Sequence, residues 1–125
     1  MTVYRVENSL GAGMYRGKVE VNALKEYDDD MRHPMPWYDS KLMRSLDSAG
    51  HVSGYDAVIW SPWRFGFSSL EQMRRWLYND RMRYELQDAG FFVAVYESDE
   101  EHHGDTQAVF KRNSPLVRRI DITEI

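Results

Sequence analysis

The chain has 125 residues, which is enough for one domain with a hydrophobic core and too few for two. Its content of 42% hydrophobic and 14% aromatic residues is typical of a globular protein and excludes a disordered one. It has no apolar run near the roughly 20 residues of a membrane span and no secretory signal at its start, so we expect a cytoplasmic protein. The absence of cysteine excludes disulfides, thiolate nucleophiles and cysteine-ligated zinc.

The formal net charge of −4 argues against a general nucleic-acid binder, which needs a basic surface to displace counterions from phosphates. The charges are nevertheless clustered. Acidic clusters lie at Glu26–Asp30 and Glu97–Glu101, and five arginines surround the predicted central helix: Arg64, Arg74, Arg75, Arg81 and Arg83. Such clusters usually form solvated surfaces and less often steer a charged partner.

The first predicted element is a strand at Thr2–Glu7, whose alternation places Val3 and Arg5 on one face. An arginine inside a strand needs a partner. Arg5 is therefore interpreted as a ligand for a phosphate or carboxylate, through its planar set of donors. The alternatives are a surface-facing arginine on an edge strand or an arginine paired with a carboxylate of the protein. The glycines of Asn8–Gly13 predict a turn after the strand.

The middle of the chain has a weaker pattern. Two prolines within His33–Asp39 exclude a regular helix. Asp39–Leu46 has apolar residues at helical spacing, which predicts a short helix. Tyr55–Trp60 fits either a brief strand or a buried loop, and Pro62 ends it.

A clear helix signal begins at Ser68, which forms a predicted capping box with Glu71. An apolar stripe follows at helical spacing: Leu70, Met73, Trp76 and Leu77. A second helix is predicted at Arg81–Ala89, with Gly90 as its C-terminal cap.

The last third of the chain predicts strands. Phe91–Glu97 is apolar on both faces, as expected for a strand inside a covered sheet. Gln107–Lys111 and Val117–Ile122 predict an antiparallel pair joined across Asn113–Pro115. We therefore predict one α+β domain over residues 1–125, with a small, mostly antiparallel sheet and a central helical hairpin or broken helix.

Four aromatic residues of the irregular middle are candidates for a partner-binding surface: Trp37, Tyr38, Trp60 and Trp63. The alternative is that they are core residues holding long loops in place. Met31, Met35 and Met43 extend either kind of surface.

His102 and His103 follow three acidic residues and predict a solvated loop with no metal site. Adjacent histidines rarely both reach one ion, and the segment lacks the spaced pair typical of zinc sites. His33 and His51 are isolated in the sequence. The spacing indicates no Ser-His-Asp or paired-carboxylate arrangement, so we assign no catalytic residue.

Three segments together resemble a reduced ADP-ribosyltransferase domain. Val3-Tyr-Arg-Val resembles that family's first strand, whose arginine or histidine contacts NAD, with Arg5 at this position. Phe67-Ser-Ser-Leu is similar to the aromatic-Ser-Thr/Ser segment that enters a helix, and it marks Ser68 as a ligand-binding candidate. Asp105-Thr-Gln-Ala-Val-Phe-Lys-Arg resembles the stretch with the catalytic glutamate, but Gln107 occupies the glutamate's position. The chain also resembles small proteins of bacteriophages and prophages.

A neutral amide can hydrogen-bond a ribose hydroxyl but lacks the charge that stabilises an oxocarbenium-like transition state. We therefore expect a non-catalytic or weakly catalytic ADP-ribosyltransferase-like binding module without a required cofactor. The resemblance implies a phage-encoded modulator or inhibitor of a bacterial host defence protein, acting in the host cytoplasm.

Two alternatives remain open. One is an active NAD-dependent ADP-ribosyltransferase or NAD glycohydrolase, in which Arg5 clamps the pyrophosphate and Gln107 or a nearby acid orients the ribose. The other is a single-stranded nucleic-acid binder that uses the loop aromatics and the arginines of the central segment.

Overall fold

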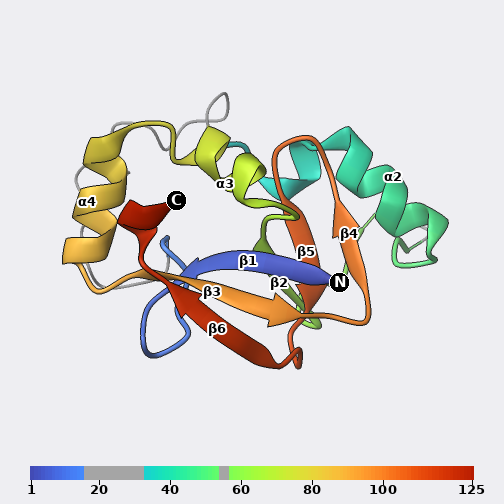
Figure 1. Ribbon diagram of the computed structural model, residues 1–125. Helices are drawn as coiled ribbons and strands as arrows, with labels where there is room; N and C mark the ends of the chain where they lie inside the picture. The colour runs from blue at the N-terminus through green and yellow to red at the C-terminus, as the bar shows by residue number, and fades with distance from the viewer. Residues whose placement is uncertain (16–32, 54–56) are drawn as a thin grey trace.

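The computed structural model describes residues 1–15, 33–53 and 57–125, which form an α+β structure with two antiparallel sheets (Figure 1). The first sheet has the order β1-β3-β6, with β1 at Thr2–Glu7, β3 at Phe92–Glu97 and β6 at Leu116–Ile120. The second has the order β2-β5-β4. Its strands are β2 (Trp63–Gly66), β5 (Ala108–Lys111) and β4 (Glu101–His103). The α+β class and the antiparallel pairing are confirmed, but the strands form two sheets where we predicted one.

The late strand pair was predicted wrongly. β5 pairs with β2 and β4, whereas β6 pairs with β3 in the other sheet. The turn after Lys111 therefore carries the chain between sheets and does not close a hairpin. The acidic segment before β5, predicted as a solvated loop, contains β4 and forms the hairpin instead. Strand propensity identified the strands, but it carries no information on pairing partners.

The two sheets are joined between β1 and the residue after β2. Tyr4 N donates to Phe67 O (2.9 Å), and Phe67 N donates to Tyr4 O (2.7 Å). This approach requires glycine at position 66, because a Cβ atom there would lie 2.4 Å from the Tyr4 carbonyl oxygen.

The helical elements lie around the sheets (Figure 1). The short 3-10 helix η1 (Pro36–Tyr38) leads into α2 (Ser40–Ser48), which lies beside β4. Helices α3 (Leu70–Trp76) and α4 (Asp80–Asp88) cover one face of the first sheet, and η2 (Ile122–Glu124) packs against α4. The predicted helix at Asp39–Leu46 and the predicted broken central helix are confirmed. Among the described helices, none is long and apolar enough to cross a membrane.

The predicted capping box is displaced by one residue. Ser69, not Ser68, caps α3, because its side chain accepts a hydrogen bond from Gln72 N at 3.0 Å. The Gln72 side chain reaches back to accept from Ser68 N at 2.9 Å, a role that we had given to Glu71. The cap predicted at the end of α4 is confirmed: Ala89 ends the helix, and Gly90 follows with a φ of 92°.

The core has three parts. One lies between the first sheet and α3 and α4, and it contains Met73, Leu77, Met82, Leu86, Phe91 and Val93. A second lies where the sheets face each other, with Val3, Ala94, Tyr96 and Phe110. The third joins α2 to the second sheet through Leu42, Leu46, Trp63 and Val109. Since α3 has only seven residues, it depends on this packing for its stability.

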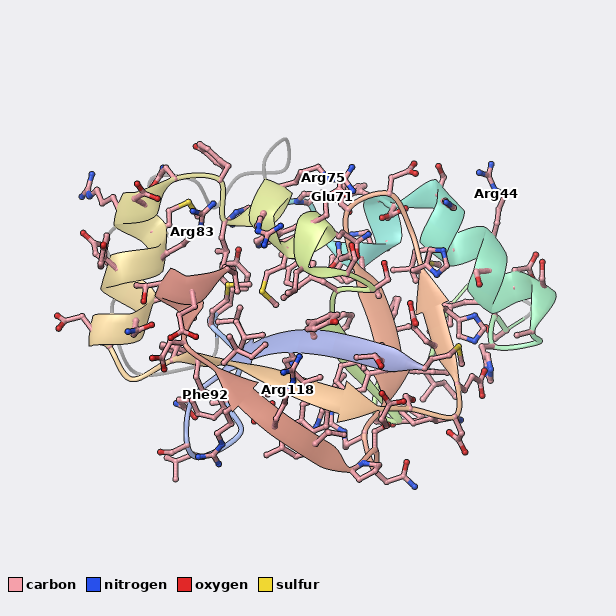
Figure 2. The ribbon with its side chains drawn as sticks, viewed as in Figure 1. Arg44, Glu71, Arg75, Arg83, Phe92 and Arg118 are labelled. Atoms are coloured by element: carbon pink, nitrogen blue, oxygen red, sulfur yellow. The ribbon has the colours of Figure 1, made fainter. Side chains whose placement is uncertain are left out.

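Several charged side chains lie on the outer faces of these elements (Figure 2). Arg44 projects from α2, Glu71 and Arg75 project from α3, and all three are exposed. Arg83 instead donates to Leu77 O at 2.8 Å and so satisfies a carbonyl just after α3. Arg64, another arginine of the predicted cluster, donates a hydrogen bond to the Tyr96 hydroxyl. The acidic cluster at Glu26–Asp30 lies outside the described residues.

Candidate functional site

An exposed aromatic surface lies on the turn that precedes α2. Trp37 and Tyr38 are 51% and 64% exposed, and neighbouring Met35 is 47% exposed. The rings of Trp37 and Tyr38 lie 6.2 Å apart between centroids. Pro36, between these residues, is buried and anchors the turn. We call Met35, Trp37 and Tyr38 the aromatic platform.

Asp39, which directly follows the platform in sequence, fixes it to the rest of the fold and is only 6% exposed. Its carboxylate accepts from Leu42 N at 3.2 Å, which caps α2. It also accepts from Asp105 N at 3.2 Å and from both Thr106 N and Thr106 Oγ1 at 2.9 Å. Burial acts to raise the pKa of Asp39, but these hydrogen bonds outweigh burial and hold the pKa below its ordinary value.

Gly104 completes this support. A Cβ atom at position 104 would lie 2.2 Å from the carboxyl atoms of Asp39, so no larger residue fits without displacing Asp39. The Gly104 carbonyl oxygen accepts from Gln72 Nε2 at 2.9 Å, and Gly104 N donates to Gln107 O at 2.8 Å. The turn between β4 and β5 therefore joins α2 to α3.

Gln107, a predicted ligand-binding residue, is buried in this support. Its Nε2 donates to Pro34 O at 2.9 Å, just before the platform. The side-chain amide thus fixes the backbone that leads into the exposed aromatics. The sequence identified Gln107 as a candidate site residue, at the start of a predicted strand. It identified Asp39 only as the start of a predicted helix.

The other two aromatic candidates lie elsewhere. Trp63 is 2% exposed in the core beneath α2, so it is a core residue and not part of a partner-binding surface. Trp60 is half-buried and packs against Phe65, with ring centroids 5.5 Å apart. Their burial follows from position: Trp63 begins β2 with its side chain toward α2. Of the methionines, Met43 packs against this core, and Met31 lies outside the described residues.

Arg5, the predicted phosphate or carboxylate ligand, lies in a polar cluster between the sheets. Its Nη1 donates to Phe65 O at 2.8 Å, and its Nε lies 3.5 Å from Glu7 Oε1. Glu7 is 5% exposed and accepts a short hydrogen bond from the Tyr96 hydroxyl. That hydroxyl accepts in turn from Arg64 Nη1 at 2.9 Å. Two arginines, one carboxylate and one phenol therefore lie together, and the buried Arg5 Nε has its ion pair with Glu7 but no hydrogen bond among the described residues.

Electrostatics in this cluster follow from burial. Burial lowers the pKa of Arg5, although the charge of Glu7 acts in the opposite direction. Burial and the hydrogen bond to Glu7 raise the pKa of Tyr96 to about 12. The phenol therefore stays protonated at neutral pH and donates to Glu7.

Ser68 is hydrogen-bonded within its own segment. Its hydroxyl donates to Gln72 Oε1 at 3.2 Å. Within the described part of the chain, no hydrogen bond or ion pair joins any two of Arg5, Ser68 and Gln107. A surface pocket of about 390 Å³ lies apart from all three, lined by Glu97–Asp99 and by Asn113, Ser114 and Pro115.

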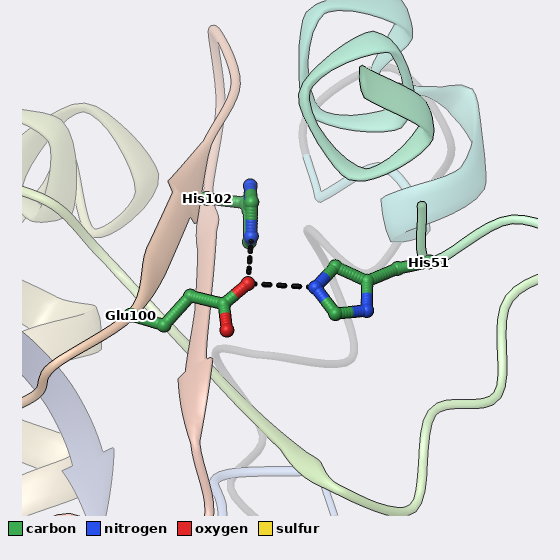
Figure 3. A group of neighbouring side chains, drawn as sticks. All are labelled: His51, Glu100 and His102. Atoms are coloured by element: carbon green, nitrogen blue, oxygen red, sulfur yellow. Dashed lines mark hydrogen bonds and ion pairs between the residues drawn. The ribbon is translucent and has the colours of Figure 1, made fainter. Parts of the chain in front are cut away.

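A second polar cluster connects His51, just after α2, to Glu100 and His102 at β4. Glu100 Oε2 lies 2.6 Å from His51 Nε2 and 2.7 Å from His102 Nε2 (Figure 3). The hydrogen bonds from His102 and His51, with the nearby charge of Lys111, outweigh burial and lower the pKa of Glu100 to about 2. The sequence predicted a solvated loop at His102 and gave no sign of this cluster, because His51 is 49 residues from Glu100.

Fold and site together define a small α+β protein in which buried polar contacts support an exposed aromatic surface. The chain belongs to the family described as Bacteriophage T4 Y00F protein, whose model matches residues 1–123. It is thus a member of a bacteriophage protein family, as its resemblance to phage proteins predicted. No curated protein and no solved structure is significantly similar to it.

Proposed function

We propose that this phage protein is a non-catalytic binding module that attaches to a bacterial host protein through the aromatic platform. The observation that carries the proposal is the combination of exposure and rigidity at Trp37 and Tyr38. Both rings lie mostly in solvent, yet the backbone beneath them is fixed by Pro36 and Asp39. The expected effect on the host is modulation or inhibition of the bound protein, for example one of its defence proteins.

Rigid exposed aromatics favour binding for an energetic reason. Trp and Tyr contribute the largest share of binding energy in many protein interfaces, because they bury much apolar area at low cost in conformational entropy. A turn that is already ordered loses little further entropy on association. The anchors of Asp39 and Gln107 keep the turn ordered before a partner arrives.

The scaffold proposed beneath this surface is ADP-ribosyltransferase-like. Support comes from the placement of the three matching segments: Arg5 on β1, Phe67–Ser69 between β2 and α3, and Gln107 immediately before β5. Two small antiparallel sheets joined at Tyr4 and Phe67 also suit this scaffold.

The contacts of the same residues favour lost catalysis. The Arg5 guanidinium is engaged by Phe65 O and Glu7, and the carboxylate of Glu7 neutralises its charge. The Gln107 amide is engaged by Pro34 O. To bind the pyrophosphate of NAD, Arg5 would have to leave a buried carboxylate without its cation, which is unfavourable.

The test is a binding experiment with a matched control. The wild-type chain, the Trp37→Ala/Tyr38→Ala variant and the Tyr84→Ala variant are immobilised and exposed to host lysate. Captured proteins are identified, purified and titrated against each variant. Tyr84 is a suitable control because it is 65% exposed, as Tyr38 is, but it lies on α4.

We expect a stoichiometric complex that the platform variant weakens by about 100-fold or more and that Tyr84→Ala leaves unchanged. Equal binding by all three proteins would contradict the platform as the interface. In parallel, labelled NAD is incubated with the wild type and Arg5→Ala. Release of nicotinamide or transfer of label by the wild type alone would establish the enzymatic alternative instead.

A further inference from the structure

His51, Glu100 and His102 bring three metal-ligand atoms together from two distant parts of the chain (Figure 3). His51 follows α2, Glu100 precedes β4, and His102 lies within β4. Their ligand atoms all lie within 4.8 Å of one another. Both imidazole Nε2 atoms point at the same carboxylate oxygen, Glu100 Oε2.

The orientation of the two rings is fixed by their surroundings. Ser45 Oγ, on α2, lies 2.7 Å from His102 Nδ1 and is hydrogen-bonded to it. The Trp63 ring packs edge-to-face against both imidazoles. Its centroid lies 5.0 Å from that of His51 and 5.4 Å from that of His102. Such partners of the second ring nitrogen, together with close ring packing, keep the Nε2 atoms of metal-binding histidines directed at the ion.

From this arrangement we propose that His51 Nε2, His102 Nε2 and Glu100 Oε2 form a three-ligand site for a zinc-class divalent cation. Two imidazoles and one carboxylate are a ligand set that zinc uses, with water in the fourth position. The site is distinct from the aromatic platform, and it does not depend on the proposed function.

The required movement is small. Zinc binds nitrogen and oxygen at about 2.0–2.2 Å, so neighbouring ligand atoms of a tetrahedral site lie about 3.3 Å apart. The present separations from Oε2 are 2.6 and 2.7 Å, and they would open by less than about 1 Å. The two Nε2 atoms lie within 4.8 Å of each other, so they would approach by at most about 1.5 Å. His51 and Glu100 side chains are 29% and 31% exposed, which gives an ion access from solvent.

Binding also has a consistent proton balance. Without a metal, each Nε2–H donates a hydrogen bond to the Glu100 carboxylate. On binding, each imidazole ligates in its neutral form through Nε2, with its proton on Nδ1, and any additional proton is released to solvent. His102 Nδ1–H then donates to Ser45 Oγ, which already lies at hydrogen-bond distance.

Lys111 is the feature that opposes a cation. Its Nζ lies 3.4 Å from Glu100 Oε1 and 4.7 Å from the centroid of the Trp63 ring. It occupies the other carboxylate oxygen and so leaves Oε2 to the histidines. Its positive charge near the ion lowers the affinity that the three ligands would otherwise provide.

The experiment is a titration of the chelator-treated full chain with Zn²⁺, Co²⁺, Mg²⁺ and Ca²⁺ at neutral pH, followed by calorimetry and, for Co²⁺, by visible absorption. We expect one Zn²⁺ or Co²⁺ per chain, with Mg²⁺ and Ca²⁺ far weaker. His51→Ala and Glu100→Gln should each weaken Zn²⁺ binding about tenfold or more. His51 and Glu100 are partly exposed, and circular dichroism verifies that both variants are folded.

His103→Ala is the matched control, since His103 is adjacent in sequence but 54% exposed and outside the cluster. Its Zn²⁺ affinity should equal that of the wild type. Absence of Zn²⁺ binding by the wild type, or equal loss in His103→Ala and His51→Ala, would overturn the proposal. Binding of Mg²⁺ as tight as that of Zn²⁺ would also overturn it, because that pattern indicates acidic surface groups alone.

A further variant tests whether the ion binds beside Glu100. Lys111→Met keeps apolar contact with Trp63 but removes the positive charge beside Glu100. We expect its Zn²⁺ affinity to rise about threefold or more. An unchanged or lower affinity would contradict an ion at Oε2.

Discussion

The aromatic platform and the Arg5 cluster use buried polar groups in opposite ways. Beneath the platform, Asp39 and Gln107 direct their hydrogen bonds at backbone atoms of neighbouring segments, and this fixes apolar side chains in solvent. Between the sheets, Glu7 contacts the side chains of both Arg5 and Tyr96, while Arg5 donates its hydrogen bonds to backbone carbonyl oxygens. The first region is therefore the one that we propose as the surface for a partner. The second contributes to the junction of the sheets and is largely shielded from solvent.

This difference separates binding from catalysis on the same scaffold. A ligand-binding arginine needs donors that a phosphate can reach. The Arg5 side chain is only 14% exposed, and it forms an ion pair with Glu7. A binding surface needs exposed apolar area on a fixed backbone, which is what Trp37 and Tyr38 provide.

The largest expected effect comes from breaking the Arg5 cluster at Glu7. Glu7→Ala leaves the buried Arg5 without its anion and Tyr96 without its acceptor, so we expect a loss of about 3 kcal/mol of unfolding free energy. Urea unfolding followed by tryptophan fluorescence measures it. The control is Glu97→Ala, whose ion pair with the N-terminus is exposed and should contribute little. Equal stability of both variants would mean that the cluster is solvated and open to ligands.

A smaller effect is expected from Asp39→Ala. It removes the cap of α2 and three further hydrogen bonds, so we expect a loss of about 2 kcal/mol in urea unfolding. Partner binding should fall together with stability, because the platform loses its anchor. Ser40→Ala, an exposed neighbour at the start of α2, is the control and should be neutral. Lost stability with intact partner binding would show that the platform does not need Asp39.

The contribution of Asp39 should depend on pH. Its pKa in the folded protein lies below the ordinary value of 3.8. Its carboxylate therefore stabilises the fold fully above about pH 4, and this stabilisation is lost as the pH falls through the lowered pKa. The stability difference between the wild type and Asp39→Asn should be constant near neutral pH and shrink in acid. A constant difference down to pH values below the lowered pKa would contradict a charged Asp39.

The sequence predicted the elements better than their partners. Period-two alternation placed β1, a run that is apolar on both faces placed β3, and a glycine cap marked the end of α4. Local signals specify such elements because their causes lie within a few residues. Strand pairing failed because β5 and β6 are adjacent in sequence but belong to different sheets, and no local pattern distinguishes these cases.

The residues of the platform and of the His51 cluster were also only partly predictable from local sequence patterns. The exposed pair of Trp37 and Tyr38 was among the aromatic candidates, but Trp63 has the same residue type and is buried. Thr106 and Asp105 reach Asp39 across 67 and 66 residues, and His51 reaches Glu100 across 49. Such contacts come from the fold and leave no spacing signal in a single sequence.

The smallest effect on stability is expected at the platform itself. Trp37→Ala/Tyr38→Ala removes side chains that lie mostly in solvent and leaves Pro36 and Asp39 in place, so the unfolding free energy should change by less than about 0.5 kcal/mol. Urea unfolding of this variant beside Asp39→Ala measures the contrast directly. A large loss at Trp37 and Tyr38 would mean that the rings stabilise the fold. The expected result, unchanged stability with lost partner binding, assigns these aromatics to recognition, because their exposure then serves no purpose within the folded chain.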